Sequence, residues 1–360
     1  MITAESAGAI LTIDLDAVVD NWRLLKSRLR NGADCGAVVK ANAYGLGVDK
    51  VAPALARAGC ISFFVATLDE GIELRGLLPD PDIYVLGGPF PGTDGEFLRH
   101  GLIPVLNAPE QVSAWRRSGK AAPCALHIDT GMGRLGLTAA EFETFLDQPE
   151  GLSVVLLMSH LACAEEPAHP KNRAQLSIFT RATHALPGVK ASLVNSSGIL
   201  LGEDWCFDLA RPGAALYGVN PRPNESNIMS PVVRLKGRVV QVRAMHAHET
   251  VGYGATYTLP GERRIATVAV GYADGFPRSA SGRAVGYVGD LAAPLVGRVS
   301  MDLTTFDVTD IPPETMKPGA WIDLIGPRNP VDILAAQAGT IGYEILTSLG
   351  RRYFRRTIGG

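Results

Sequence analysis

Short apolar runs alternate with helix-length segments between residues 37 and 210, and this alternation constrains the fold more than any other feature of the chain. Such runs are typical of parallel strands buried on both faces, and helices connect strands of this kind in βαβ units. Eight repeats favour a closed (β/α)8 barrel, a TIM barrel, over an open sheet. The expected strands are residues 37–39, 63–66, 83–86, 103–106, 124–128, 152–158, 191–194 and 207–210.

Several of the intervening segments have the pattern of an amphipathic helix. Apolar residues recur at helical spacing from Val18 to Leu29, so residues 16–29 are predicted to form a helix with Asp16 as its N-cap. Further helices are expected at residues 48–58, 68–74, 139–146 and 172–186.

The pattern changes after residues 220–224 (NPRPN), a segment rich in residues that break regular structure. Beyond it, apolar and polar residues alternate in short runs punctuated by glycine and proline, which is typical of antiparallel strands. The runs are residues 237–243, 265–270, 283–288 and 321–325, with one helix expected at 331–338. We therefore predict a barrel domain at residues 1–235 and a mostly antiparallel β domain at residues 236–360.

Charge and hydropathy argue against several classes of partner. The chain has 34 basic and 36 acidic residues, a formal net charge of −2, and no basic cluster. Binding to nucleic acid or to a membrane surface therefore has no electrostatic support. The beginning of the chain lacks the pattern of a secretory signal, and the apolar runs are too short to span a bilayer, so a cytoplasmic protein is expected.

Cysteines and histidines do not form a convincing metal motif. The five cysteines are odd in number and never spaced as Cys-x-x-Cys, so they predict neither a disulfide framework nor a zinc site. His246 and His248 place two imidazoles on one face of a strand, but no third ligand is near them in the sequence. Solvated histidines fit this pattern better, and no metal is expected.

Lys40 follows the first expected strand and precedes small residues and two glycines, in the stretch 37–47 (AVVKANAYGLG). The carboxyl ends of barrel strands are where reacting groups collect, so Lys40 is a candidate nucleophile of the kind that forms a Schiff base. A solvated lysine on a loop is the alternative, and the motif alone does not decide between them.

Four other expected strands also end in polar groups. Arg134 lies in a glycine-rich loop, His160 follows strand six, Ser196 follows strand seven, and Arg211 with Gly213 follows strand eight. Each has an ordinary alternative: a core histidine, a surface ion pair or a helix N-cap. Together with Lys40, however, they form one rim that could hold a phosphate and an aldehyde, which points to pyridoxal 5′-phosphate.

Seven segments of the chain resemble bacterial alanine racemase, and the resemblance extends from residue 11 to about residue 352. It implies a pyridoxal-phosphate-dependent racemase that interconverts L-alanine and D-alanine by a two-base mechanism, as a homodimer with active sites shared between subunits. The product would supply peptidoglycan synthesis or belong to D-alanine catabolism. The segments are residues 38–47, 127–137, 194–197, 209–213, 251–257, 270–275 and 297–302.

The resemblance also implies a role for each matching residue. Lys40 would carry the cofactor and act as one base, and Tyr253 of the partner subunit would act as the other, because inverting a stereocentre needs a proton removed on one face and delivered on the other. His160 and Arg211 would assist the tyrosine, with Arg211 facing the pyridine nitrogen. Arg134 would hold the cofactor's phenolic oxygen and, with the backbone of Met301, the substrate carboxylate. The implied phosphate contacts are Tyr44, Ser196, Gly213, Ala214 and Tyr343, and the implied lining of the substrate entrance is Tyr272, Arg278 and Arg298.

Two positions depart from the family pattern. Many relatives have a lysine, modified to a carbamate that pairs with the arginine, where this chain has His127. No modified residue is expected at His127, so the partner of Arg134 would be the neutral imidazole, a bound anion or another carboxylate. Glu165 stands where relatives usually have an aspartate, a difference that concerns access rather than chemistry.

Three other functions compete with this interpretation. A racemase of broader amino-acid specificity is the nearest. A decarboxylase of basic amino acids would need a glutamate at the ring nitrogen and a cysteine in the second domain, yet Arg211 is a cation and no cysteine follows Cys206. A non-catalytic carrier of pyridoxal phosphate would leave the second domain unexplained. The sequence does not decide between synthesis and breakdown of D-alanine, or whether Lys40 and Tyr253 meet within one chain or between two.

Overall fold

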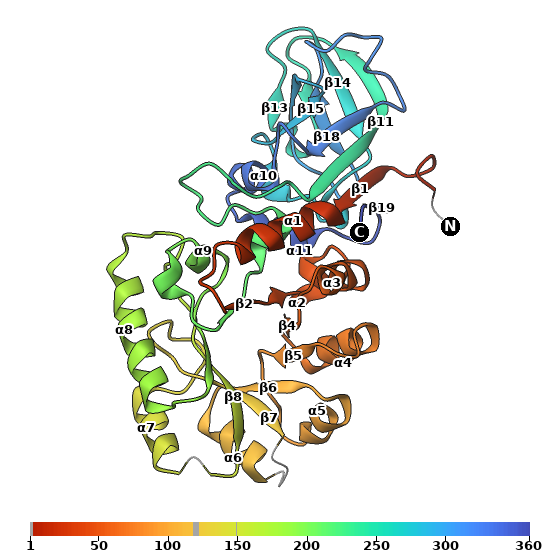
Figure 1. The fold of residues 1–360 in the computed structure, drawn as a ribbon. Helices are drawn as coiled ribbons and strands as arrows, with labels where there is room; N and C mark the ends of the chain where they lie inside the picture. The colour runs from red at the N-terminus through yellow and green to blue at the C-terminus, as the bar shows by residue number, and fades with distance from the viewer. Residues whose placement is uncertain (1–2, 118–121, 149) are drawn as a thin grey trace. The chain divides into compact units, whose positions relative to one another are not determined.

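The computed structural model describes residues 3–117, 122–148 and 150–360, which form two compact units (Figure 1). The first, called here the barrel unit, comprises Val18–Leu216 and Asn220–Met229. The second, called the sheet unit, comprises Met1–Ala17, Tyr217–Val219 and Ser230–Gly360.

Seven parallel strands of the barrel unit form one sheet in chain order, as the alternating runs predicted. Their pairing is in register from strand to strand, with one irregularity between β7 and β8. The strands are β3 (Ala37–Val38), β4 (Ser62–Val65), β5 (Asp82–Val85), β6 (Ile103–Leu106), β7 (Pro123–His127), β8 (Ser153–Met158) and β9 (Lys190–Ser192).

The eighth strand connects the two ends of this sheet. β10 (Leu209–Ala210) pairs in parallel with β2 (Asp34–Cys35), which leads through one residue into β3. On its other side, Arg211 N donates to Val194 O at 3.0 Å, just beyond β9. The backbone hydrogen bonding therefore continues around the whole ring of strands, which agrees with the predicted (β/α)8 fold class.

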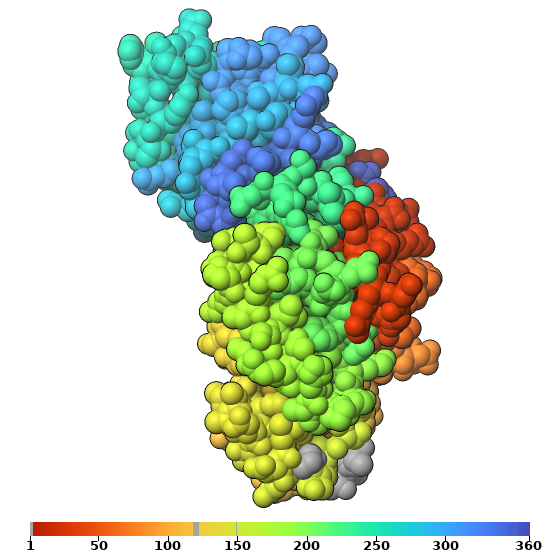
Figure 2. All heavy atoms as spheres, turned by 60° about the vertical axis from the view of Figure 1, so that its left-hand side comes forward, coloured from red at the N-terminus to blue at the C-terminus, as the bar shows by residue number. Residues whose placement is uncertain are grey.

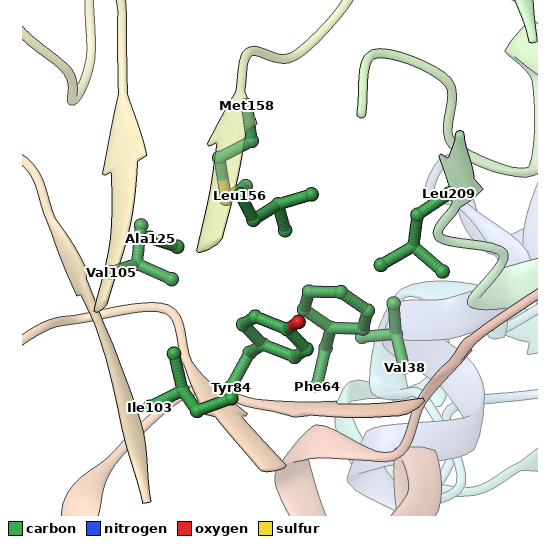
Figure 3. Close-up of a cluster of buried hydrophobic side chains, with 9 residues drawn as sticks. All are labelled: Val38, Phe64, Tyr84, Ile103, Val105, Ala125, Leu156, Met158 and Leu209. Carbon is green, nitrogen blue, oxygen red and sulfur yellow. The ribbon is translucent and has the colours of Figure 1, made fainter. Parts of the chain in front are cut away.

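Apolar side chains from the strands meet in the interior of the barrel unit (Figure 3). The rings of Phe64 and Tyr84 stack there, with centroids 4.7 Å apart and planes 13° apart. Burial raises the pKa of the Tyr84 hydroxyl, so this phenol stays protonated. The cluster is a filled core of the TIM-barrel kind, made by Val38, Phe64, Tyr84, Ile103, Val105, Ala125, Leu156, Met158 and Leu209.

Helices follow the strands, and two of them begin with a capping box. In α4 the Thr67 side chain accepts the N–H of Glu70 while the Glu70 carboxylate accepts that of Thr67; Thr138 and Glu141 form the same capping box in α7. Side chains of α8 lie at the outer surface of the unit, in yellow-green in Figure 2. The helices are α1 (Leu15–Lys26), α3 (Val48–Arg57), α4 (Leu68–Leu77), α5 (Asp94–His100), α6 (Pro109–Arg117), α7 (Ala139–Asp147), α8 (Pro170–Ala185) and α9 (Ser196–Ile199).

Helix α1 begins one residue before Asp16, and the predicted N-cap was wrong. The carboxylate of Asp14 accepts the N–H of Ala17 at 3.1 Å, so Asp14 caps the helix. Asp14 also ends strand β1 (Ala9–Asp14), and an aspartate at the junction of strand and helix satisfies an amide that neither element can bond.

The sheet unit is organised around β11 (Val233–Met245), which pairs antiparallel with β1 (Ala9–Asp14), β14 (Arg263–Val268) and β18 (Trp321–Ile325). A register shift between Val239 and Gln241 interrupts its pairing with β14. This agrees with the predicted antiparallel domain. The other strands are β12 (Thr250–Val251), β13 (Tyr257–Thr258), β15 (Val285–Val288), β16 (Leu291–Pro294), β17 (Thr304–Asp307) and β19 (Phe354–Ile358).

Several elements of the sheet unit were not foreseen, among them one strand and one helix. Strand β1 pairs with β11 and, in parallel, with β19, although it comes from the start of the chain. Helix α11 (Gly342–Ser348) follows the predicted helix α10 (Val331–Ala338). The domain division at residues 235/236 stays a prediction, while the compact units differ from it by including β1 and residues 230–235 in the sheet unit.

Candidate active site

Lys40 opens the short turn α2 (Lys40–Tyr44), two residues after strand β3 ends. The four residues after it have positive φ, with values of 52° at Ala41, 56° at Asn42, 52° at Ala43 and 53° at Tyr44. This is a left-handed conformation that costs non-glycine residues about 1 kcal/mol or more each. A strained turn at this position is held by its surroundings, as is common at functional sites.

Local hydrogen bonds fix the shape of this turn. Ala43 N donates to Val39 O at 2.8 Å, and Gly45 N donates to Ala41 O at 2.7 Å. The side-chain oxygen of Asn42 accepts the N–H of Val48, the first residue of α3, at 2.8 Å. The turn is therefore bonded from both of its ends and from its middle.

The amine of Lys40 is shifted toward its neutral form. Burial is the main reason why its pKa is lowered, and the positive charge of Arg134 acts in the same direction, while the carboxylate of Glu70 opposes both. A lysine needs its neutral amine to attack a carbonyl, so this environment favours a nucleophilic role.

Arg211 is the most deeply buried cation of the site, with 4% of its surface exposed. Its guanidinium donates to Ser159 O at 2.6 Å and to the hydroxyl of Ser192, and among the described residues it has no carboxylate partner. It also lies 6.0 Å from the centre of the Phe64 ring. Burial lowers the pKa of Arg211 to about 10, so the group remains charged at neutral pH.

His160 accepts a third bond from Arg211, whose Nη2 lies 3.4 Å from the histidine Nδ1. Because a guanidinium has donors only, Nδ1 must be the acceptor and the neutral ring carries its proton on Nε2. Burial, followed by the charge of Arg211, lowers the pKa of His160 to about 3. The imidazole is therefore neutral and offers one N–H donor.

Four predicted phosphate contacts come together in the barrel unit. The Ser196 hydroxyl, at the start of α9, accepts the N–H groups of Gly213 at 2.9 Å and Ala215 at 3.2 Å. A Cβ added to Gly213 would overlap the hydroxyl of Tyr44 and lie 3.1 Å from its Cζ. Ala214 begins the 3-10 turn η2 (Ala214–Tyr217) beside them. Glycine is needed at position 213 because the tyrosine packs directly against its backbone.

Arg134 lies in the loop after β7, and Asp129 determines the course of that loop. The Asp129 carboxylate accepts the N–H groups of Gly131 and Met132, both at 2.8 Å, and of Gly133 at 2.9 Å. Burial by itself would raise the pKa of Asp129. The three hydrogen bonds outweigh this effect, so the net result is a lowered pKa. A charged aspartate thus holds the backbone from which the exposed Arg134 side chain extends.

His127 is buried, and a residue that the sequence did not suggest determines its tautomer. Asn107 donates from Nδ2 to Leu86 O and Val105 O, both at 2.9 Å, so its Oδ1 is left to accept from His127 Nδ1 at 2.8 Å. Burial, followed by the charge of Arg211, lowers the pKa of His127 to about 4. The ring is therefore neutral, with an acceptor at Nε2. Asn107 directly follows strand β6, and that position was the only signal by which it could have been found.

The remaining predicted residues lie in the sheet unit. Tyr253 begins the turn η3 (Tyr253–Ala255) and is 72% exposed. Gly252 and Gly254 flank it with φ of 77° and 74°, and both pack near Arg298. The turn presents the phenol outward from its own unit.

A second group in the sheet unit surrounds the turn η4 (Tyr272–Asp274). Tyr272 N donates to Ser300 O at 3.0 Å, and Ala273 N donates to Met301 O at 2.9 Å, which brings Tyr272 and Met301 side by side. Arg278 opens the next turn, and Tyr343 lies in α11 with 39% of its surface exposed.

Two kinds of feature are absent from the described residues. None of the helices found there is long and apolar enough to cross a membrane. Across the same residues, no three His, Cys, Asp or Glu side chains are grouped so that they could hold a metal ion.

Two family models together match nearly the whole chain. The model described as alanine racemase, N-terminal domain, matches residues 13–221, and that described as alanine racemase, C-terminal domain, matches residues 232–357.

Individual relatives match over nearly their full length. The alanine racemase of Rhodospirillum rubrum is 55% identical, covering 98% of this chain and 96% of that protein. A catabolic alanine racemase of Mesorhizobium japonicum is 47% identical, and the match covers 100% of this chain and 96% of that protein. The crystal structure of alanine racemase from Bartonella henselae with covalently bound pyridoxal phosphate is 40% identical and superposes with a TM-score of 0.94, covering 98% of this chain and 100% of that one.

Proposed function

The chain belongs to the alanine racemase family, and on that premise we propose that it interconverts L-alanine and D-alanine with pyridoxal 5′-phosphate as cofactor. The observation that carries the proposal beyond family membership is the pair formed by the buried Arg211 and the half-buried His160. A guanidinium without a carboxylate partner, bonded to a neutral imidazole, suits a site in which a ring nitrogen must stay unprotonated.

The residues of the barrel unit fit the proposed cofactor. The proposed phosphate contacts are Tyr44, Ser196, Gly213 and Ala214, together with Tyr343 of the sheet unit. Ser196 already accepts two backbone bonds, so its own O–H is left to donate to an anion, and the absent Cβ of Gly213 makes room beside the Tyr44 hydroxyl. When bound, pyridoxal phosphate supplies an electron sink for the carbon that loses its proton.

We assign the two proton transfers to Lys40 and Tyr253. The lowered pKa of Lys40 favours the neutral amine, which is the form that can take up a proton. A phenol is normally too weak a base there, so Tyr253 needs a donor that stabilises its oxygen. We propose that the Nε2–H of His160, fixed by Arg211, is that donor, and that the tyrosine comes from the partner subunit of a homodimer. Its exposed position in its own unit supports this.

Substrate binding is assigned to groups on both units. Arg134 would bind the substrate carboxylate together with the backbone of Met301, and the entrance would be lined by Tyr272, Arg278 and Arg298. For the partner of Arg134 we favour the neutral His127, because Asn107 leaves its Nε2 as an acceptor. A bound anion next to His127 Nε2 would face the lone pair of that nitrogen, which argues against an anion at this position.

The test is a reconstitution with defined readouts. The purified protein with pyridoxal phosphate should absorb in the visible range, and borohydride should fix the cofactor to Lys40. Circular dichroism should then follow L-alanine to the racemate, whereas Lys40→Ala should lose both signals. A cofactor bound without turnover would support a carrier, release of CO2 would support a decarboxylase, and equal turnover of larger amino acids would support the broader racemase.

The cellular role is part of the proposal. We infer a cytoplasmic enzyme that either supplies D-alanine for peptidoglycan or consumes it, since the same reversible chemistry serves both. Growth of a deletion strain distinguishes them: dependence on added D-alanine indicates supply, and failure to grow on D-alanine indicates breakdown.

A further inference from the structure

The carboxylate of Glu70 reaches across from helix α4 to the strained turn that begins at Lys40. Its Oε1 accepts the N–H of Ala41 at 2.6 Å, and its Oε2 accepts the N–H of Ala66 at 2.7 Å. The N–H of Thr67 lies 3.4 Å from the same Oε2. One side chain thus bonds the first residue after Lys40 and the residues that connect β4 to α4.

This bond has a counterpart on the other side of Lys40. The residue before the lysine, Val39, donates its N–H to Phe64 O at 2.9 Å. Lys40 therefore lies between two anchors, one on each side, and both are provided by the segment from β4 to α4. The bonds within the turn fix its shape, whereas these two fix where the turn lies relative to the neighbouring strand.

Helix capping alone does not require this arrangement. Glu141 occupies the same capping-box position in α7, and its carboxylate accepts the N–H of Thr138 at 2.8 Å and the Thr138 hydroxyl at 2.9 Å. Within the described part of the chain, the hydrogen bonds recorded for the Glu141 carboxylate all stay at the start of its own helix. The hydrogen bond from Ala41 to Glu70 Oε1 is therefore not part of the helix cap but is formed in addition to it.

The strain of the turn explains why such an anchor matters. Ala41 is the first of four left-handed residues, each less favourable than an ordinary conformation. A charged acceptor forms a stronger bond to a backbone N–H than a neutral one does. Removing it would release the turn at the residue adjacent to the lysine.

We propose that Glu70 is a positioning residue for Lys40, holding the left-handed turn so that the lysine amine is presented to the aldehyde of the cofactor. This rests on the proposed function, in which Lys40 binds pyridoxal phosphate. The linkage forms when the neutral amine adds to the aldehyde carbon and water leaves, giving a C=N bond. Glu70 takes no part in this exchange of bonds; it fixes the backbone from which the amine extends.

The test compares three alanine variants of the full-length protein, stripped of cofactor and reloaded with pyridoxal phosphate. Glu70→Ala removes the anchor and the cap, Thr67→Ala weakens the cap of the same helix, and Glu141→Ala removes the matching cap of α7. Samples are quenched with borohydride over time, and the labelled peptide containing Lys40 is quantified by mass spectrometry. Labelling should slow roughly tenfold in Glu70→Ala and stay within about twofold of wild type in the other two. Equal slowing in Glu70→Ala and Thr67→Ala would overturn the proposal.

Hydrogen exchange gives a second readout that does not depend on the cofactor reaction. In the wild-type holoenzyme the Ala41 amide should be protected, and an Ala41 amide that exchanges at the unprotected rate overturns the proposal even if Glu70→Ala does not fold. The wild-type protein separates the two hypotheses. Absence of label at Lys40 in wild type contradicts the proposed function, whereas normal labelling in both wild type and Glu70→Ala contradicts only the role of Glu70.

Discussion

Asn107 Oδ1 lies 2.8 Å from His127 Nδ1, and the two backbone carbonyls that hold the Asn107 amide dictate that the histidine donates this bond. Because burial keeps the His127 ring neutral, its lone pair is then on Nε2. An asparagine after strand β6 thus sets the chemistry of a histidine at the end of strand β7.

Replacing this asparagine with a charged acceptor should reverse the protonation of His127. In Asn107→Asp the new carboxylate favours the imidazolium, so the pKa of His127 should rise from about 4 toward or above its ordinary 6.5. The measurement is a pH titration of the ring nitrogens by NMR. A wild-type His127 that titrates near 6.5, or that carries its proton on Nε2, contradicts the assignment.

Two neutral histidines, the buried His127 and the half-buried His160, should make the folded state sensitive to acid. The pKa values of His127 and His160 fall to about 4 and about 3 on folding, so below pH 6.5 the unfolded chain binds more protons than the folded one. Each histidine should then lower the free energy of unfolding by about 1.4 kcal/mol per pH unit until its folded pKa is reached. Urea unfolding between pH 7 and pH 4 measures this slope. His127→Gln should make it shallower.

Glycine at position 41 should relieve the left-handed turn. Ala41→Gly removes a cost of about 1 kcal/mol in the folded state but adds freedom to the unfolded chain, so its stability should equal or exceed that of wild type. Ala174→Gly, at an exposed position inside α8, should instead lose about 0.5 to 1 kcal/mol. Both variants report on the barrel unit by denaturant unfolding. A loss at Ala41 as large as that at Ala174 would show that the turn is not left-handed in solution.

Alanine at position 213 should disturb the proposed phosphate site. In Gly213→Ala the new Cβ overlaps the Tyr44 hydroxyl, which should cost about 1 to 3 kcal/mol and weaken cofactor binding. Adding Tyr44→Phe removes the overlapping oxygen, so the double variant should regain part of the stability. Gly76→Ala is the control, since a Cβ there meets no atom within 4 Å in helix α4. Fluorescence titration with pyridoxal phosphate gives the affinities, and full affinity in Gly213→Ala would argue against this site.

The assignment of two bases predicts an asymmetric defect. Tyr253→Phe should slow removal of the α-proton from one enantiomer of alanine more than from the other, measured as exchange with deuterated water. A single base would give equal losses.

If the active sites are shared between subunits, mixing two inactive variants should restore enzyme activity. Lys40→Ala and Tyr253→Phe subunits are each inactive in homodimers, but random exchange should regain about a quarter of wild-type activity, because half of the dimers then contain one intact site. Verified mixed dimers without activity would contradict sharing between subunits.

The fold could be predicted well from sequence because its strongest signal is local. Most strands of the barrel contain a continuous apolar run, and the predicted helix at 331–338 coincides with α10. The first strand of the chain was missed because its partners, β11 and β19, lie more than two hundred residues away, and no local pattern carries that information.

The candidate site was predicted in part for a related reason. Lys40, Arg134 and Arg211 were noticed because reactive or charged groups after buried runs are unusual. Asn107 and Glu70 were not, because an amide after a strand and a glutamate in a capping box are both ordinary in sequence. Their second bonds, to His127 and to Ala41, exist only once the neighbouring strands are assembled. The left-handed turn was equally hidden, since Ala and Tyr give no indication of positive φ and a single Asn gives only a weak one.

The pairing of β1 with β11 and β19 sets the order in which the protein can be completed as it is made. Residues of β1 leave the ribosome long before those of β11 and β19, so this strand has open edges while the barrel residues are made. The barrel strands, each adjacent to the next in sequence, can assemble meanwhile. The sheet unit is finished only when β19 has been made and pairs with β1.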